Sequence, residues 1–415
     1  MKKIVSLILI LALAVSLVAC GGQASNPTPS NQPSQSSQPS ASSNPSGGAD
    51  DKDPIIIGSI QDISNETSVM GLMIAEGIRW QVETINQAGG INGRKIKLIE
   101  YDSKANVDES INAYNRLVSE GAVAVIGPHQ ANIGIALAPI AQQAKVPVVL
   151  MGMDNRVTRQ GEDGKGEPWG YMFLMQPSCD LQGALMAKFA INDLGYKKFG
   201  VLYRSDNSYS YSLYYAFDAY CKANGAEIVA VETFQAGDTD FKTMLSKLIA
   251  SDMEALFCPN YTGELVAITQ QARGLGYDGV MINGLDSAPP FNTLCGPEAD
   301  NVYFVSNIRL DDPKVIEVVN AFRAATGNDE PNQINKFCVG YDMMGALGSV
   351  IKAGATDRES IRTAMENLTN YQGLTGSITI DPKTHQPSGL EMIMHKIENG
   401  ENIPIKAYTA EPVAY

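Results

Sequence analysis

Histidine is scarce in this chain of 415 residues, which contains only three. His129, His385 and His395 have no spacing that resembles an H-E-x-x-H pattern, so neither a metal site nor a histidine-based acid–base pair is indicated. The chain also lacks a G-x-G-x-x-G motif after a strand, a Walker phosphate loop and a G-x-S-x-G elbow. These absences predict a protein that is not an enzyme and that carries no metal and no cofactor.

Positive charge is also limited, because 31 lysines and arginines face 45 acidic residues and give a formal net charge of −14. Such a surface repels nucleic acid and anionic lipid, so no nucleic-acid partner is expected. The few cysteines have neither metal-ligand nor disulfide spacing, which predicts buried thiols beyond Cys20. Those later cysteines are Cys179, Cys221, Cys258, Cys295 and Cys338.

The N-terminus has the pattern of an export signal. Two lysines precede an apolar run from Ile4 to Val18, which is too short to span a bilayer and is followed by small residues. The junction resembles the bacterial lipobox, in which the cysteine, here Cys20, becomes the lipid-modified first residue. An ordinary secreted protein with an incidental cysteine is the alternative. We expect a signal peptide at residues 1–19 and an extracytoplasmic lipoprotein anchored to the cell membrane.

Residues 20–52 consist mainly of Ser, Pro, Asn, Gln and Gly, and beyond Cys20 they include no aromatic residue and no aliphatic residue larger than Ala. This composition cannot bury a core, so we expect a disordered tether. The body that follows exceeds the size at which one hydrophobic core usually keeps growing, so two lobes are expected.

The body alternates strand-like runs with helical periodicity, which predicts an α/β fold with parallel sheets. Asn106 and Glu109 form a possible capping box at the start of one helix. Strands are predicted at 55–60, 95–102, 122–126, 146–151, 199–203, 228–231, 255–258, 280–283 and 302–306, with extended patterns at 377–380 and 390–397. Helices are predicted around 74–85, 107–118, 133–140, 180–194, 209–224, 241–249, 264–274, 315–325 and 339–353.

We expect two similar lobes, each with a mainly parallel sheet. Residues 53–175 with about 307–373 are predicted to form the first lobe. Residues 176–306 with about 374–415 are predicted to form the second lobe. The segments beyond Asp311 are expected to cross between the lobes rather than to form a third domain.

Ligands of parallel α/β sheets bind beyond the carboxyl ends of the strands, so the residues after each strand are candidates. Free N–H groups at the helix start near Asn132 suit a carboxylate, while Asp154 or Asp286 suits an ammonium. Tyr209 and Tyr261 are placed to wall an apolar part of the ligand. The candidate positions are Ser64, His129, Gln130, Ala131, Asn132, Met153, Asp154, Tyr209, Tyr261 and Asp286.

Some of these residues also have a structural interpretation. Asp154 fits a turn or helix-cap aspartate, and Asp286 is open to the same question. His129 fits a loop histidine with satisfied hydrogen bonds. The tyrosines between 209 and 220 have partly helical spacing, so most of them are expected to pack, with Tyr209 the exception.

Short motifs in a fixed order resemble the amino-acid-binding proteins of branched-chain amino-acid ABC transporters. The resemblance covers nearly all of the body, and the order of the motifs after a lipobox makes it specific. The motifs are I-N-Q-A-G-G-I-N-G-R at 85–94, Y-D at 101–102, V-I-G-P at 125–128, Q-A-R at 271–273, L-G at 275–276, Y-D at 341–342, G-L-T-G at 373–376 and I-D at 380–381.

The resemblance implies a type I periplasmic-binding-protein fold with two Rossmann-like lobes joined by three crossover segments. It implies that a small-molecule ligand, an amino acid or a related amine-bearing solute, is closed between the lobes and delivered to ABC permease subunits. Closure is then favoured when the ligand contacts both lobes. A monomer is expected, and a sensory ligand-binding protein that signals through a membrane receptor is the alternative function.

Several pocket residues depart from the family pattern. By the resemblance, the family's carboxylate-binding serine falls at Ala131, its ammonium-binding threonine at Asp154 and its second-lobe acidic residue at Asn283. The aromatic residue of the first loop falls at Met70, whereas the second-lobe tyrosine is kept as Tyr209. We therefore expect Asp154 to replace the charge missing at Asn283, which leaves a cationic or a zwitterionic ligand open, and the individual solute stays unnamed.

Overall fold

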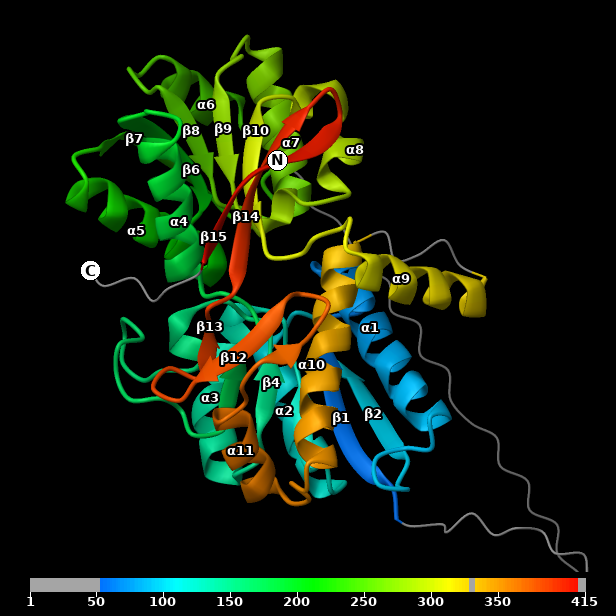
Figure 1. Cartoon of the computed structure of the whole chain (residues 1–415). Coiled ribbons are helices and arrows are strands. Elements are labelled where there is room, and N and C mark those ends of the chain that lie inside the picture. Colours follow the sequence, from blue (N-terminus) through cyan, green and yellow to red (C-terminus); the bar gives the residue numbers. More distant parts are fainter. Residues whose placement is uncertain (1–52, 328–332, 410–415) are drawn as a thin grey trace, which may run out of the picture. The chain divides into compact units, whose positions relative to one another are not determined.

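The computed structural model describes residues 53–327 and 333–409. The predicted signal peptide, Cys20 and the predicted tether lie outside the described residues. The described part contains two large sheets and a small third one, and Figure 1 labels most of their strands and the helices around them. We call the part built on the first sheet the first lobe and the part built on the second sheet the second lobe.

The first sheet is wholly parallel, with the strand order β2-β1-β3-β4-β5. Four of its strands coincide with predicted strands. The fifth strand was not predicted. It has only three residues and follows an irregular segment with several glycines, so its sequence shows no strand periodicity. The strands are β1 (Ile55–Gln61), β2 (Ile96–Asp102), β3 (Ala124–Ile126), β4 (Val148–Leu150) and β5 (Met172–Leu174).

The helices of the first lobe follow the predicted apolar spacing. They are α1 (Ser68–Gln87), α2 (Val107–Ser119) and α3 (Ala131–Ala144). At the start of α2, the side chain of Asn106 accepts the backbone N–H of Glu109 at 3.0 Å. The Glu109 carboxylate lies 3.4 Å from Lys104 instead of closing the reciprocal bond. The predicted capping box is therefore only half formed.

The second sheet is mainly parallel and ends in two antiparallel strands, in the order β15-β14-β10-β9-β8-β6-β7. Its strands are β6 (Lys198–Arg204), β7 (Glu227–Phe234), β8 (Ala255–Cys258), β9 (Val280–Asn283), β10 (Val302–Ser306), β14 (Glu391–Glu398) and β15 (Glu401–Thr409). Its main helices are α4 (Cys179–Asn192), α5 (Ser208–Ala223), α6 (Lys242–Ile249) and α7 (Thr262–Gly274), followed by the single-turn α8 (Phe291–Cys295). The predicted α/β fold with two mainly parallel sheets is confirmed.

The chain returns to the first lobe after β10. Two helices there match predictions, although α10 begins five residues before the predicted start, and the polar α11 was not predicted. The small sheet β11-β12-β13 follows, and the backbone N–H of Leu174 donates to the carbonyl of His385 beside it. The elements are α9 (Pro313–Thr326), α10 (Ile334–Lys352), α11 (Arg358–Glu366), β11 (Tyr371–Gln372), β12 (Ser377–Asp381) and β13 (Gln386–Ser388).

After β10, the next strand that belongs to a large sheet is β14, which pairs with β10 in the second lobe. β13 lies beside β5 of the first sheet, and the side chain of Gln386 donates to Asn155 and Thr158 of the first lobe. The last passage between lobes therefore falls between Ser388 and Glu391, later than the predicted limit at 373/374.

Two glycines let α1 and α10 pack backbone against backbone, and Figure 1 shows the two helices side by side. A Cβ at Gly77 would lie 2.0 Å from the carbonyl oxygen of Phe337, and a Cβ at Gly340 would lie 2.1 Å from that of Ile74. No side-chain rearrangement relieves a clash with a carbonyl group. This contact fixes the first turn of α10 on the first lobe.

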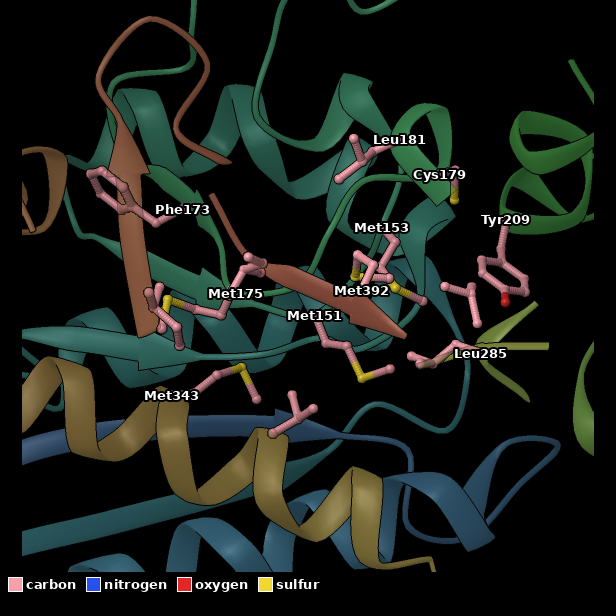
Figure 2. Close-up of a cluster of buried hydrophobic side chains, with 14 of the residues drawn as sticks. Met151, Met153, Phe173, Met175, Cys179, Leu181, Tyr209, Leu285, Met343 and Met392 are labelled. Carbon is pink, nitrogen blue, oxygen red and sulfur yellow. The ribbon is translucent and has the colours of Figure 1, made fainter. Parts of the chain in front are cut away.

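The largest core cluster contains residues of both lobes and is rich in methionine. Methionine is unbranched and adapts to irregular gaps, which suits a junction between lobes. Figure 2 shows Met151, Met153, Met175, Met343 and Met392 in this cluster, with Tyr209 and Leu285 of the second lobe. Within the described residues, no helix has both the length and the apolar character needed to cross a membrane.

Candidate functional site

The candidate residues stand at the carboxyl ends of the strands, as predicted from the topology. His129 and Gln130 follow β3, and Asp154 follows β4. In the second lobe, Tyr209 follows β6 and Asp286 follows β9. All five side chains are buried. The two sheets therefore bring a set of buried polar groups to the ends at which ligands of such sheets bind.

His129 belongs to a hydrogen-bonded network in the first lobe. Its Nδ1 lies 3.0 Å from Oε1 of Gln61, and its Nε2 lies 2.9 Å from Oγ1 of Thr67. Gln130 donates to the same Thr67 hydroxyl at 2.7 Å, while its own Oε1 is buried without a hydrogen-bond partner among the described residues. Burial lowers the pKa of His129 to about 4, a shift that Asp62 opposes and Lys336 reinforces. The imidazole is thus neutral at physiological pH.

Two tyrosines of the second lobe form a stacked wall. The rings of Tyr209 and Tyr261 lie 5.4 Å apart and are inclined by 7°. The Tyr209 hydroxyl is buried and has no hydrogen-bond partner of standard geometry among the described residues. Burial, with the neighbouring Asp286 carboxylate, raises the pKa of Tyr209 well above its usual value. A neutral phenol facing a carboxylate is ready to donate a hydrogen bond.

Asp286 takes part in a buried ion pair between the lobes. Its Oδ1 accepts from Nζ of Lys336, in the first turn of α10, at 3.1 Å. Both residues are 2% exposed. The second oxygen, Oδ2, is buried and has no hydrogen-bond partner of standard geometry in the described part of the chain, although the Tyr209 hydroxyl is a close neighbour of the carboxylate. The neighbouring Asn283 donates from its amide to Ser287 at 2.9 Å, and its Oδ1 is likewise unpaired there.

Asp154 is also 2% exposed, but its carboxylate is surrounded by donors. It caps the short helix η1 (Asn155–Val157), and the Arg156 guanidinium donates to both of its oxygens, from Nε at 2.9 Å and from Nη2 at 2.6 Å. The backbone N–H of Arg156 adds a third bond at 2.9 Å, and the hydroxyl of Ser212 on α5 a fourth at 2.6 Å. The helix-cap alternative raised for Asp154 therefore describes its geometry.

A cavity of about 370 Å³ opens beside Asp154. Among the residues that line it are Asp180, Tyr211 and Tyr215. Burial, followed by the Asp154 charge, raises the pKa of Asp180 to about 6. This cavity lies between the loop after β4 and the helices α4 and α5, and Asp286 is not among the residues that line it.

The remaining predicted positions lie around these groups. Ser64 is exposed and donates to Asp102, and Asn132 is exposed in the first turn of α3. Ala131 is buried at the start of α3, and Met70 packs half-buried against the core. Met153 is buried and its sulfur accepts from Gln182 at 3.0 Å. The exposed Ser64 and Asn132 thus differ from the buried set, and the ligand-binding role of every position stays a prediction.

Lys336 is the charged group that the sequence-based prediction missed. The predicted helix began at Val339, so the first turn that carries Lys336 was not assigned. A signal was present, because Lys336 directly precedes the mainly apolar residues 337–341, and nearly every residue from Ile334 to Met344 is buried in the structure. A cationic side chain in such a run is rarely placed there by packing alone.

Metal ligation and disulfides receive no support from the described residues. Within 53–327 and 333–409, no three or more His, Cys, Asp or Glu side chains are arranged to hold a metal ion. The five cysteines in those ranges are buried and unpaired, which confirms the predicted buried thiols.

Two α/β lobes with buried polar groups at the facing strand ends define a class of two-lobed small-molecule-binding proteins. The family model described as periplasmic binding protein matches residues 54–401. The chain therefore belongs to the periplasmic binding protein family, and the predicted type I fold and the resemblance to branched-chain amino-acid transporter proteins are confirmed.

Individual relatives agree with this assignment. An amino acid binding protein of Pseudomonas aeruginosa is 28% identical over 320 residues, which cover 73% of this chain and 80% of the relative. A leucine-binding protein from Thermotoga maritima MSB8 has 26% identity and a TM-score of 0.75, over 86% of this chain and 99% of that structure. A branched-chain amino acid transporter substrate-binding protein from Streptococcus pneumoniae, solved with isoleucine, has 26% identity and a TM-score of 0.74, over 86% and 100%.

Proposed function

We propose that this protein is the extracytoplasmic solute-binding lipoprotein of an ABC importer. It captures an amino acid or a related small amine-bearing solute between its lobes and delivers it to the permease. The observation that carries the proposal is the set of buried, unpaired polar atoms contributed by both lobes at the strand ends. They include Gln130 Oε1 in the first lobe and the Tyr209 hydroxyl and Asp286 Oδ2 in the second.

Contacts between the lobes support a mechanism of closure. The Arg204 guanidinium lies 2.7 Å from Glu66, the Ser212 hydroxyl 2.6 Å from Asp154, and the Lys336 ammonium 3.1 Å from Asp286. Each contact joins a group of one lobe to a group of the other, so they stabilise the closed arrangement. A ligand that contacts both lobes favours the same arrangement, and the closed form is the one that docks on the permease.

Of the two candidate carboxylates, we assign the ligand's ammonium to Asp286 rather than to Asp154. Asp154 already accepts four hydrogen bonds, whereas Asp286 accepts one of standard geometry, from Lys336, and its buried Oδ2 has only the neighbouring Tyr209 hydroxyl as a potential donor. The stacked rings of Tyr209 and Tyr261 lie near Asp286 and offer an apolar surface on the second-lobe side. The protein acts as a monomer and is held at the membrane through a lipid on Cys20.

A binding screen tests the capture of an amino acid. A ligand at about 100 times its Kd stabilises the folded state by about 2.7 kcal/mol, which a thermal-unfolding screen of amino acids and amides detects. Calorimetry on the full chain then gives the affinity of each hit. Saturable binding of at least one amino acid is expected, and no binding across the screen would contradict the proposal.

Delivery and anchoring need separate tests. Deletion of the gene is expected to abolish high-affinity uptake of the amino acid found in the screen, and unchanged uptake argues for the sensory alternative. Mass spectrometry of the mature N-terminus is expected to find a lipid on Cys20. The Cys20→Ser variant is expected to leave the membrane fraction, and its retention there would contradict the anchor.

A further inference from the structure

The ion pair between Lys336 and Asp286 is buried more completely than its hydrogen bonding justifies. Each residue is 2% exposed, and one hydrogen bond of 3.1 Å joins them. An ammonium has three donors and a carboxylate about four acceptor sites, so most of this capacity is unused among the described residues. Buried charges stabilise a fold only when further hydrogen bonds satisfy them, and a well-packed apolar pair is often as good or better.

The surroundings of the pair contain more unused polar atoms. Asp286 Oδ2 and the Tyr209 hydroxyl have no partner of standard geometry in the described part of the chain. The Lys336 ammonium bonds to the second-lobe Asp286, and its charge also lowers the pKa of His129 in the first lobe. The N-terminal residue of α3, Ala131, has no side-chain donor for a carboxylate. Lys336 is thus the cation that lies among the candidate residues of both lobes.

We propose that Lys336 and Asp286 select the ligand by exchanging partners. When an amino acid enters, its carboxylate replaces Asp286 as the partner of Lys336, and its ammonium replaces Lys336 as the partner of Asp286. Every buried charge then stays paired, and the free Oδ2 and the Tyr209 hydroxyl supply additional bonds. This inference rests on the proposed function, and it defines the ligand class as zwitterions with adjacent ammonium and carboxylate groups.

The exchange predicts that a ligand with only one charge binds poorly. A simple carboxylate pairs with Lys336 but leaves Asp286 buried without a counter-charge, and a simple amine leaves Lys336 in the same state. Leaving one member of a buried pair unmatched is strongly unfavourable. Lys336 is therefore a specificity-determining residue as well as a contact between lobes.

The test compares leucine with its two single-charge analogues, 4-methylpentanoate and 3-methylbutan-1-amine, by calorimetry on the full chain. The unsubstituted protein is expected to prefer leucine over either analogue by about 100-fold or more. Asp286→Asn frees Lys336 and is expected to gain 4-methylpentanoate binding, to within about tenfold of its leucine affinity. Lys336→Met frees Asp286 and is expected to gain binding of the amine in the same way.

Two further variants keep the test decisive. The neutral double variant Asp286→Asn/Lys336→Met leaves no unpaired charge, so it is expected to fold and to bind all three probes weakly. Glu66→Gln removes a different contact between the lobes, with Arg204, and is expected to change the three affinities together without changing the preference. A thermal-unfolding shift with each probe shows whether the single variants are folded and bind.

The outcomes separate this inference from the proposed function. If the single variants lose leucine and gain neither analogue, the pair has a structural role only and the inference is wrong, while amino-acid binding by the unsubstituted protein still supports the proposed function. If the unsubstituted protein binds no amino acid, the proposed function fails. The gain or absence of analogue binding in the single variants then still decides for or against partner exchange.

Discussion

Two buried aspartates, each paired with a basic residue, differ in how fully they are hydrogen-bonded. The Asp154 corner consists of Asp154, Arg156 and Ser212, and its carboxylate accepts four bonds of 2.6 to 2.9 Å. The Asp286 centre consists of Asp286, Lys336 and Tyr209, and its carboxylate accepts one bond of 3.1 Å. Both aspartates follow a strand and both are 2% exposed. The two aspartates therefore have the same place in the topology and the same burial.

The comparison separates a carboxylate whose hydrogen bonding is saturated from one whose hydrogen bonding is not. Arg156 belongs to the same loop as Asp154 and its side chain is 29% exposed, so this pair is local and partly hydrated. Lys336 comes from another lobe and its side chain is as deeply buried as its partner. A saturated carboxylate has little capacity left for a ligand, whereas an unsaturated buried carboxylate gains bonds when a ligand arrives.

The largest expected effect is the loss of stability on breaking the Asp286 centre. Asp286→Asn leaves the Lys336 ammonium buried without a counter-charge, which costs about 3–5 kcal/mol of unfolding free energy. Urea denaturation at pH 7 measures this loss. The neutral double variant with Lys336→Met is expected to unfold within about 1 kcal/mol of the unsubstituted protein, because no buried charge is left unpaired. Equal stability of the single and double variants would show that Lys336 is not held by Asp286.

The second effect is a dependence on pH near the Asp286 centre. Burial lowers the pKa of His129 from 6.5 to about 4, so the unfolded chain binds a proton that the folded chain does not. Stability falls as the pH drops from about 6.5 to about 4, by about 3 kcal/mol over that window. His129→Asn removes this slope, which urea denaturation at several pH values checks. An identical slope in the variant would mean that His129 is charged in the fold.

Asp180, which lies beside the Asp154 corner, is expected to change the stability with pH in the opposite direction. Burial and the charge of Asp154 raise the pKa of Asp180 from 3.8 to about 6, so the folded chain binds the proton more tightly. Stability from this group decreases as the pH rises from about 4 to about 6. Because Asp180 is partly exposed, the change is about 1–2 kcal/mol. Asp180→Asn is expected to raise stability at pH 7, and a decrease at pH 7 would contradict this assignment.

The fold was predictable because local patterns and topology agree. The spacing of apolar residues predicts most strands and helices of both lobes. The alternation of strands with helices along the chain then predicts parallel sheets. The failures include segments that give weak periods: the three-residue β5, the polar α11, in which only Ile361 and Met365 are buried, and the edge strand β15, in which only Tyr408 is buried. The return of β13 to the first lobe depends on tertiary contacts such as that of His385, which no local pattern contains.

The candidate site was predictable only by position. The buried polar groups lie at the carboxyl ends of the strands, and this location could be predicted from the topology alone. Arg156 is close to Asp154 in sequence, but other partners come from elsewhere in the chain: Lys336 lies 50 residues from Asp286, and Ser212 lies 58 residues from Asp154. Sequence spacing therefore could not tell the saturated aspartate from the unsaturated one, and it favoured Asp154 for the ligand's ammonium.

The smallest expected effect is that of Asp154→Asn, and it tests the comparison most directly. The amide keeps one oxygen as an acceptor, and Arg156 is exposed enough to be hydrated, so a loss of about 1 kcal/mol is expected in urea denaturation. The affinity for the best-bound amino acid is expected to change by less than about threefold, because Asp154 has no acceptor site left for the ligand. Calorimetry with the same amino acid measures this, with Asp286→Asn alongside. If Asp154→Asn instead weakens binding more than Asp286→Asn does, the ligand's ammonium lies at the Asp154 corner, Arg156 must turn away when the ligand enters, and the charge assignment of the whole site is reversed.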